Sequence, residues 1–232
     1  AEFAADYIVR RDPDGRWCDW TGSAYVNPLA GVVGGYVIDI KEAPNGDIYV
    51  CGAFTSAGGV ANTKGIARWS KANQVWEAVG NPVTGATITQ INCMAFDANG
   101  DLYVGGYFTN LAGNANADYF AKYTVSTNKW SSLGSGIDNE VGAIEIAPNG
   151  TIYIGGSFST ASGNTNCKFI AYWNGSAWAP LATGLNGGVS TIKFHPAFGL
   201  LIGGVFTNAD GTNGDYICYW NGTAFKSYYD LG

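Results

Sequence analysis

One pattern of residues occurs four times along the chain, with a period of about fifty residues. Each copy has a glycine at the same place in a turn, and successive turn glycines lie 54, 50 and 49 residues apart, at Gly46, Gly100, Gly150 and Gly199. The segment after this turn reads YVCGAF, YVGGYF, YIGGSF and LIGGVF in the four copies. A repeat of this length indicates one supersecondary unit that buries its core against neighbouring copies.

Each repeat contains four short segments that are typical of β-strands, which we call a, b, c and d in chain order. The c segments end at an aromatic residue and the d segments carry another, at Trp69, Tyr123, Trp173 and Trp220 and at Trp76, Trp130, Trp178 and Phe225. Aromatic and β-branched residues favour strands, and Asn-Gly pairs favour tight hairpin turns. The 34 glycines and the 13% of charged residues agree with such turns and strands. The prediction is an all-β fold, a β-propeller of four-stranded blades.

A half unit precedes the first full repeat. The tripeptide that begins at Asp6 matches those that begin at Asp118 and Asp215, and Trp17 follows where the d aromatic belongs. The count is about 4.5 units, so we expect a five-bladed ring that lacks one hairpin, a part of a larger propeller, or a ring that a second chain completes. The predicted single domain covers residues 1–232, with a half blade at 5–29 and blades at 36–80, 87–134, 140–183 and 188–230.

The repeats resemble known propeller families. Residues 102–134 resemble a kelch-type blade, in which a di-glycine is followed by a Tyr and then by a Trp before a Leu. The segments YIGGSF and AYWNGSAW are similar to tandem propeller repeats of bacterial surface proteins and of phage tail or fibre proteins. The resemblance covers nearly the whole chain and implies the fold, but propellers carry binding, scaffolding and catalysis alike. Cys51, Leu201 and Phe225 depart from the pattern, which predicts that the end units pack differently.

The two ends of the predicted blades differ in their loops. The a,b and c,d turns are tight, whereas the b,c loops are longer and polar and share their face with the d,a crossovers. Because function on a rigid scaffold usually lies in variable loops, we expect ligand binding on the b,c face. The alternative is that these polar residues only satisfy the loop backbone. The candidate ligand-binding residues are Asn62, Asn114, Asn116, Asp118, Asn164, Asn166, Asp210, Asn213 and Asp215.

The repeated aromatic residues have two interpretations. An aromatic face can stack on a sugar ring, as in a lectin, but a residue that recurs at one strand position in every blade is most simply a residue that packs between blades. We therefore expect the c and d aromatics to belong to the core.

Metal and cofactor chemistry has little support in the sequence. The DANGD segment at residues 97–101 resembles the start of a calcium loop, but strand residues follow at once and the equivalent turns lack the first Asp, so a hairpin turn is the better interpretation. The five cysteines have no Cys-x-x-Cys spacing, and we expect them to be reduced and buried. The single histidine, His195, is predicted to be a turn residue. We expect no metal and no cofactor.

Catalysis is a further candidate function, because five-bladed propellers include glycosidases with paired carboxylates in the central channel. Such acids would lie in the a strands, where only Asp39, Glu42 and Glu145 occur. Glu42 stands where the other repeats have Phe96, Ile146 and Phe194, which favours a solvent-facing edge over a catalytic acid. The prediction is that the protein is not an enzyme, with a propeller glycoside hydrolase as the second alternative.

Charge and hydropathy limit the partners. The net charge of −6 disfavours nucleic acid, and the longest uncharged stretch near the start of the sequence, residues 20–38, contains four glycines and a proline and is a poor membrane helix. The predicted function is a non-catalytic recognition module that binds a glycan or a protein, placed outside the cell, on a cell surface or on a virion. The first alternative is a structural component of a virus particle or surface layer, which would join copies or neighbouring structural proteins through the blade rim.

Overall fold

A computed structural model describes residues 10–11, 17–18, 31–209 and 216–227. Four antiparallel sheets of four strands each form the main body, and we call them blades 1 to 4. Blade 1 consists of β4 (Tyr36–Glu42), β5 (Ile48–Ala53), β7 (Ile66–Ser70) and β8 (Val75–Glu77). Blade 2 consists of β9 (Thr87–Phe96), β10 (Leu102–Thr109), β11 (Phe120–Thr124) and β12 (Lys129–Ser131). Blade 3 consists of β13 (Val141–Ile146), β14 (Ile152–Gly156), β15 (Ile170–Trp173) and β16 (Trp178–Pro180). Blade 4 consists of β17 (Val189–His195), β18 (Gly199–Gly204), β19 (Ile217–Trp220) and β20 (Phe225–Ser227).

Short elements accompany the four blades. Two 3₁₀ turns lie in blade 2, η1 (Leu111–Gly113) and η2 (Val125–Thr127). A two-stranded ladder joins β3 (Val32–Val33) to β6 (Ser56–Ala57), and a second joins β1 (Arg10–Arg11) to β2 (Trp17–Cys18). The predicted all-β propeller of four-stranded blades is confirmed. In the described part of the chain, no helix is long and apolar enough to span a membrane.

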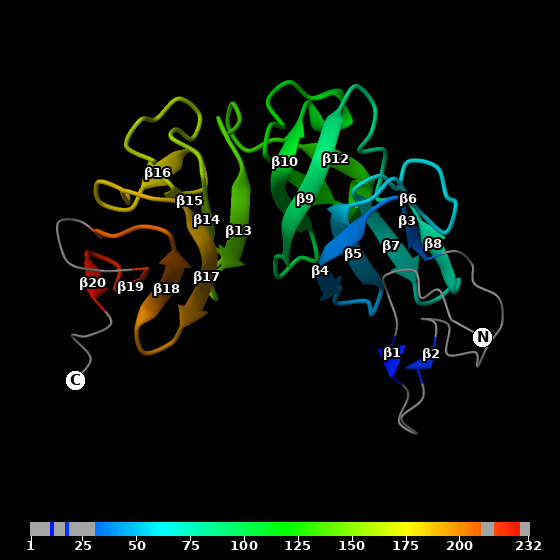
Figure 1. Ribbon diagram of the computed structural model, residues 1–232, viewed down its shortest axis with the longest axis horizontal. Coiled ribbons are helices and arrows are strands. Elements are labelled where there is room, and N and C mark those ends of the chain that lie inside the picture. Colours follow the sequence, from blue (N-terminus) through cyan, green and yellow to red (C-terminus); the bar gives the residue numbers. More distant parts are fainter. Residues whose placement is uncertain (1–9, 12–16, 19–30, 210–215, 228–232) are drawn as a thin grey trace.

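The four blades stand side by side in an open arc (Figure 1). The first strand of each blade, β4, β9, β13 or β17, lies nearest the centre of the arc, and these inner strands contact one another in that order. Blades 1 and 4 stand at the two ends of the arc and do not meet (Figure 1). The four described blades therefore form an open arc rather than a closed ring.

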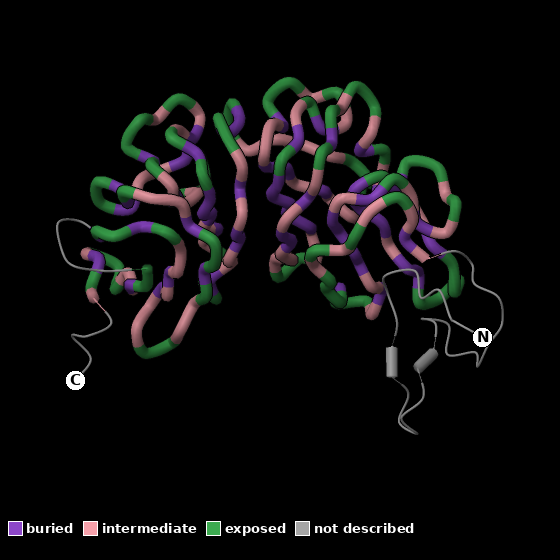
Figure 2. The backbone as a smooth tube through the Cα atoms, viewed as in Figure 1, coloured by how far each residue is buried: buried purple, intermediate pink, exposed green. Residues whose placement is uncertain are grey.

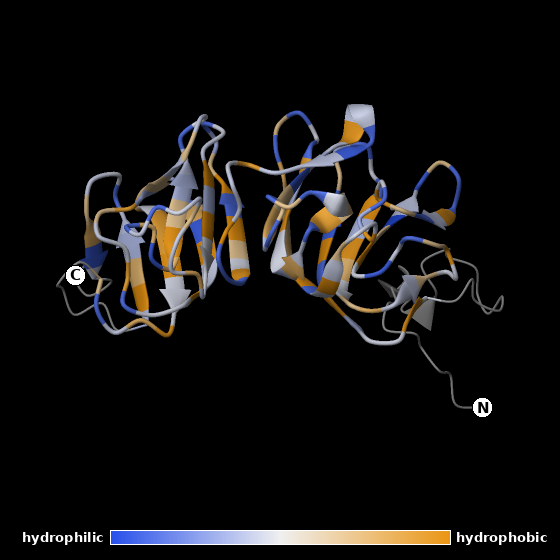
Figure 3. Ribbon diagram, turned by 90° about the horizontal axis from the view of Figure 1, so that it is seen from above, coloured by the Kyte–Doolittle hydropathy of each residue, from blue (hydrophilic) through white to orange (hydrophobic). Residues whose placement is uncertain are grey.

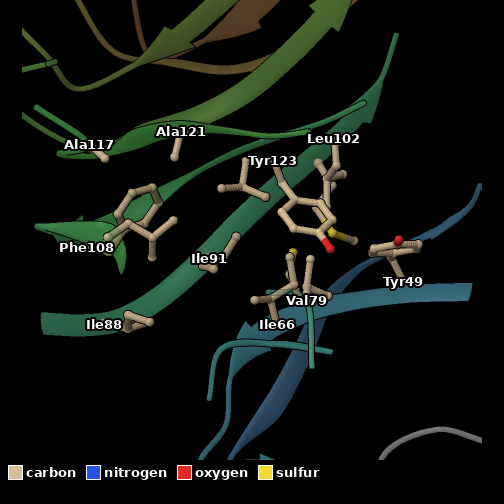
Figure 4. Close-up of a cluster of buried hydrophobic side chains, with 14 of the residues drawn as sticks. Tyr49, Ile66, Val79, Ile88, Ile91, Leu102, Phe108, Ala117, Ala121 and Tyr123 are labelled. Atoms are coloured by element: carbon tan, nitrogen blue, oxygen red, sulfur yellow. The ribbon is translucent and has the colours of Figure 1, made fainter. Parts of the chain in front are cut away.

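The core is divided among the seams between blades. Figure 2 shows the buried residues along the strands of each blade, and Figure 3 shows hydrophobic residues along the strands and hydrophilic ones mainly in loops and turns. One cluster joins blades 1 and 2, where Tyr49 and Ile66 meet Ile91 and Tyr123 (Figure 4). Two further clusters join blade 2 to blade 3 and blade 3 to blade 4. Each of these seams thus holds its own cluster, and a fourth cluster lies within blade 1 and the β3–β6 ladder.

The two adjacent glycines of strand b lie against different parts of the structure. A Cβ atom on Gly155, the first glycine in blade 3, would lie 2.8 Å from Val189 Cβ of blade 4. A Cβ atom on the second glycine, Gly156, would lie 2.9 Å from Val141 Cα, in the inner strand of the same blade, and would be closer still to Glu140 O. The inner strand has a register shift at this point in all four blades. Because the first glycine has no side chain, the next blade can approach it closely. The missing side chain of the second glycine leaves room for a β-bulge in the inner strand of its own blade.

The c and d aromatics form cross-strand pairs, as predicted for core residues. Trp69 lies opposite Trp76, and their ring centroids are 5.5 Å apart at an interplanar angle of 77°. The equivalent centroid distances in the other blades are 5.1, 5.4 and 4.9 Å. Trp178 Nε1 also donates a hydrogen bond to Leu133 O of the preceding unit, at 2.9 Å. These pairs close the outer half of each blade and tie it to its neighbour.

Candidate recognition surface on the loop face

The b,c loops and the d,a crossovers lie on the same face of the arc, as the sequence predicts, and we call it the loop face. Isolated bridges join Ile137 of one crossover to Ala161 and Leu185 of the next to Ala209. At blade 2, Ala112 N donates to Pro82 O at 3.0 Å. Loops and crossovers are therefore braced against each other, which makes this face a rigid surface.

Two residues of the crossovers hold the b,c loops, and sequence reasoning missed both. Asp138 Oδ1 accepts hydrogen bonds from Ser159 N and Thr160 N, each at 2.9 Å. At the equivalent place, Asn186 Oδ1 accepts from Thr207 N at 2.9 Å and from the next backbone N–H at 3.0 Å. The signal was an apolar residue followed by Asp or Asn in both crossovers, Ile137-Asp138 and Leu185-Asn186.

The predicted ligand-binding residues that the structure describes mostly bind their own loops. Asn114 Oδ1 accepts from Asn116 N at 2.9 Å, and Asn164 Oδ1 accepts from Asn166 N at 3.1 Å. Asp118 Oδ1 accepts from Asn110 N at 2.7 Å. These contacts bring the residues together only within one loop, in the manner of Asx turns.

The remaining predicted residues add little to this picture. Asn62 has a left-handed backbone, with φ 62°. Asp210, Asn213 and Asp215 lie outside the described residues. The ligand-binding role of all nine stays a prediction.

A pocket of about 470 Å³ opens on the loop face at the seam between blades 3 and 4. Its lining includes Lys168, Phe169, Thr183, Leu185, Asn186 and Asn208. Lys168 and Phe169 come from the end of the b,c loop of blade 3, residues 183–186 from the crossover, and Asn208 from the loop of blade 4. Sequence reasoning placed the ligand on this face but did not find this pocket, because two blades and a crossover build it together.

Phe169 is held in an unusual backbone conformation. Its φ is 64°, and the equivalent residues Tyr119 and Tyr216 have φ values of 60° and 65°. In blade 1 a glycine, Gly65, occupies this position with φ 75°. Two backbone bonds hold the conformation in blade 3, from Phe169 N to Phe158 O at 2.9 Å and from Gly156 N to Phe169 O at 3.0 Å. A bulky residue at positive φ is rare and costs about 1–3 kcal/mol, so the surrounding bonds must enforce it.

The pocket combines a cation with apolar and amide groups. Lys168 is exposed, and no ion pair of its ammonium group occurs among the residues with described positions. Phe169 is half-buried and packs against the blade 3–4 cluster, while Leu185 belongs to that cluster. Asn186 Nδ2 donates to Thr207 Oγ1 at 3.0 Å, which fixes the orientation of its side chain. These groups can hold a ligand that has an anionic end and an apolar body.

The DANGD segment is a hairpin turn, as the sequence favours. Asp97 Oδ1 accepts from Asn99 N and from Asp101 N, each at 2.9 Å. Lys122 Nζ lies 2.8 Å from Asp101 Oδ2, so a cation of the protein already neutralises this carboxylate. Within the described ranges, no group of three or more His, Cys, Asp or Glu residues is arranged to hold a metal ion.

Two of the three inner-strand acids connect neighbouring blades. Asp39 Oδ2 accepts a hydrogen bond from Met94 N of blade 2 at 3.0 Å. Glu145 Oε1 accepts from Phe194 N of blade 4 at 2.9 Å, and Lys193 Nζ donates to the same oxygen at 3.0 Å. Glu42 is exposed. The carboxylates of Asp39 and Glu145 thus join neighbouring blades through hydrogen bonds.

The cysteines and the histidine have structural environments. Cys51, Cys93, Cys167 and Cys218 are buried free thiols, as predicted, and burial raises the pKa of Cys167 to about 11 and that of Cys218 to about 12. His195 is the last residue of strand β17, directly before the a,b turn; its ring stacks on Phe198 with centroids 4.7 Å apart, and its Nδ1 accepts a hydrogen bond from Ala197 N at 3.2 Å. The sequence predicted a turn residue; the side chain does contact the turn, but the backbone belongs to the strand.

Comparison with solved structures shows the same fold. Virginiamycin B lyase from Staphylococcus aureus matches 96% of this chain over 62% of its own, with a TM-score of 0.55 and 12% identity. PorZ, a surface component of the type IX secretion system of Porphyromonas gingivalis, matches 90% over 29% of its own length, with a TM-score of 0.54 and 12% identity. The extracellular domain of a hybrid two-component system from B. thetaiotaomicron matches 74% over 20% of its own length, with a TM-score of 0.51 and 13% identity. The chain therefore spans between a fifth and two thirds of these three chains.

Comparison with protein families identifies the repeat. No curated protein matches the chain with significant similarity. The resemblance to kelch and phage tail repeats stays a prediction, since neither the family match nor the three structures above are of that kind. The model of one propeller family matches residues 36–149 and 133–219, which include parts of all four blades. The chain belongs to the family of the Rax2 C-terminal β-propeller domain.

Proposed function

We propose that this propeller is a non-catalytic recognition module that binds a protein ligand through its loop face. The observation that carries the proposal is the pocket at the blade 3–4 seam, where Lys168 and Phe169 meet the ordered amide of Asn186. Its volume of about 470 Å³ suits one or two side chains of a ligand rather than a large cofactor.

The chemistry of the pocket indicates what it would hold. The exposed Lys168 ammonium group, which has no ion pair with any residue whose position is described, favours a carboxylate, and Phe169 with Leu185 favours an apolar neighbour. The net charge of −6 would repel a strongly acidic ligand at long range. The ligand is therefore a peptide segment with a single acidic residue beside an apolar one.

Glycan binding through the same loop face is the alternative ligand class, and an extracellular or virion location is a finer part of the proposal. The loop asparagines are suited to sugar hydroxyls, although several already bind their own turns. Two of the similar structures are an extracellular domain and a bacterial surface component, which supports a place outside the cell for this chain.

Lys168→Glu tests the recognition module. A displayed library of short peptides is enriched on the immobilised protein, and the affinities of the enriched peptides are then measured for variants. We expect acidic-apolar peptides that lose about tenfold or more in affinity with Lys168→Glu. Lys129→Glu, the same charge change at an exposed residue that begins strand β12, is the matched control and leaves the affinity within about twofold.

A glycan array with the wild type and with Asn114 and Asn164 variants separates sugar from peptide binding. Peptides without acidic residues, or affinities that Lys168→Glu leaves unchanged, would contradict the assignment of the pocket. Array signals that the asparagine variants remove, without any peptide enrichment, would move the ligand class from protein to glycan.

Assembly through the ends of the arc is the second candidate function. The observation that favours it is a set of apolar residues that lie exposed at both ends, including Ile40 of blade 1 and Val205 of blade 4. Light scattering tests it, since assembly requires a species larger than the monomer when the proper partner is present.

A further inference from the structure

Two tyrosine rings lie side by side on the loop face at the seam between blades 2 and 3, and we call Tyr107 and Tyr119 the tyrosine patch. Tyr107 belongs to β10 and is 46% exposed. Tyr119 ends the b,c loop of blade 2 and packs against the cluster that joins blades 2 and 3. The ring centroids are 5.7 Å apart at an interplanar angle of 72°. The edge-to-face contact thus holds the Tyr107 ring in place while nearly half of the residue faces solvent.

The repeat does not require an aromatic residue at the position of Tyr107. The equivalent residues, directly after the second glycine of strand b, are Ala53, Ser157 and Val205. Blade packing therefore does not account for the Tyr107 ring. A solvent-facing tyrosine that a second ring holds in place is instead typical of a surface that contacts a partner.

Two carboxylates from different segments lie near the tyrosine patch. Asp118 precedes Tyr119 in the loop and Asp138 belongs to the crossover, and a hydrogen bond of 3.3 Å from Ile137 N to Asp118 O joins the two segments. Each carboxylate uses its Oδ1 atom for loop N–H groups. Among the residues that the structure describes, neither carboxylate has an ion pair and neither Oδ2 atom accepts a hydrogen bond. Burial raises the pKa of Tyr119, and Tyr107 with these two carboxylates raises it further, so both negative charges act on this ring.

The tyrosine patch has the same place at its seam as the Lys168 pocket has one seam further along. Asp118-Tyr119 aligns with Lys168-Phe169, and Asp138 aligns with Asn186. A carboxylate thus stands where the pocket has its ammonium group, which reverses the charge that a ligand must present. The b,c loop of blade 3 adjoins both sites, because Thr160 N near its start donates to Asp138 and Lys168 near its end lines the pocket.

We propose that the tyrosine patch binds an arginine side chain of the protein ligand. A guanidinium plane can stack on an aromatic face, and its N–H groups can donate to the Asp118 and Asp138 carboxylates. The net charge of −6 attracts such a cation at long range. This inference rests on the proposed function in that the ligand is a peptide, but it uses no residue of the Lys168 pocket.

The experiment first removes the charge of the pocket. A displayed library of short peptides is selected on the immobilised full chain with Lys168→Gln, and calorimetry measures the affinities of the enriched peptides. We expect peptides that contain arginine. Replacing this arginine by alanine should weaken binding about tenfold or more, because the stacking and the charge-assisted hydrogen bonds are both lost. Replacing it by lysine should weaken binding about threefold, because an ammonium group keeps the charge but lacks the plane that stacks.

Three variants of the chain test the patch with little change to the fold. Tyr107→Ser introduces the residue that blade 3 has at this position, and it should weaken arginine-peptide binding about fivefold. Asp118→Asn and Asp138→Asn keep the Oδ1 acceptors of the loop N–H groups and remove only the charge, so each should weaken binding about threefold or more. The matched controls are Val205→Ser, at the same strand position in blade 4, and Glu42→Gln, an exposed carboxylate at the a,b end of β4, and both should leave the affinity within about twofold.

The outcomes separate the tyrosine patch from the pocket. A selection on the Lys168→Gln chain that does not enrich arginine overturns the proposal. Arginine and lysine peptides that bind equally well, and that Tyr107→Ser leaves unchanged, also overturn it, since attraction to an acidic chain would then suffice. Arginine peptides that depend on Tyr107 and Asp138 support the patch even if no acidic-apolar peptide depends on Lys168, in which case only the assignment of the pocket fails.

Discussion

Gly155→Ala measures how closely the blades approach. The added Cβ atom would lie 2.8 Å from Val189 Cβ and 2.9 Å from Ile192 Cδ1, and nearer still to Val189 Cγ1. Carbon atoms prefer about 3.5–4.0 Å, so blade 4 must move away by at least ~0.7 Å or its side chains must leave their rotamers. Overpacking of this kind costs about 1–3 kcal/mol, which lowers the Tm of a chain of this length by about 2–4 °C per kcal/mol. Calorimetry and urea unfolding measure the loss.

Gly203→Ala is the matched control, because Gly203 has the same place in blade 4. Its Cβ atom would meet Thr191 Cγ2 at 3.0 Å and Tyr216 O at 3.8 Å, and none of its contacts is with another blade. We expect a loss well under 1 kcal/mol. Val189→Ala in the Gly155→Ala background should recover at least about 1 kcal/mol relative to additivity. Equal losses of unfolding free energy for Gly155→Ala and Gly203→Ala would refute the idea that the first glycine allows the next blade to approach closely. Strict additivity of Gly155→Ala with Val189→Ala would refute it as well.

Three further outcomes are expected. Asp138→Ala removes the acceptor of two loop N–H groups and should lower the free energy of unfolding by about 1–3 kcal/mol. Amide exchange at residues 159–160 should become faster, and unchanged exchange would refute the idea that Asp138 holds the loop. A hydrogen bond from Asn73 and the ion pair with Arg68 lower the pKa of Glu77, so its contribution is present above the ordinary carboxyl pKa and is lost as pH falls through the lowered value. Glu77→Gln should therefore destabilise the protein by about 1 kcal/mol at pH 7, and this loss should shrink as pH falls through the lowered pKa of Glu77, as pH-dependent urea unfolding would show. Burial raises the pKa of Cys167 to about 11, so mass spectrometry should find this thiol unlabelled by an alkylating reagent at pH 8 until denaturant is added; labelling of the folded chain would contradict it.

The strand order and the blade type could be predicted because local signals agree with the fold. Asn-Gly turns, paired aromatics and the b-strand glycines recur at one spacing. The signals that specify each blade therefore lie within about fifty consecutive residues. The assignment of loops and crossovers to one face followed from the same order. The interpretation of the aromatics as core residues was also correct, since a ring at one place in every blade meets the same partner each time.

The parts that could not be predicted depend on contacts between blades. The two glycines look alike in the sequence, but Gly155 meets the next blade and Gly156 meets a bulge in its own sheet. The pocket at Lys168 arises from a loop, a crossover and a neighbouring loop, none of which signals a cavity alone. The positive φ of Phe169 was also hidden, because an aromatic residue at that place gives no local indication of a left-handed backbone.

The division of the core among seams has a mechanical consequence. Since each seam holds its own cluster, removing an end blade breaks one seam and leaves the others intact. Under a pulling force on the two chain ends, the protein should not rupture in a single event. It should yield one blade at a time, each releasing about fifty residues, or ~170 Å of extended chain, from the free ends of the arc inward.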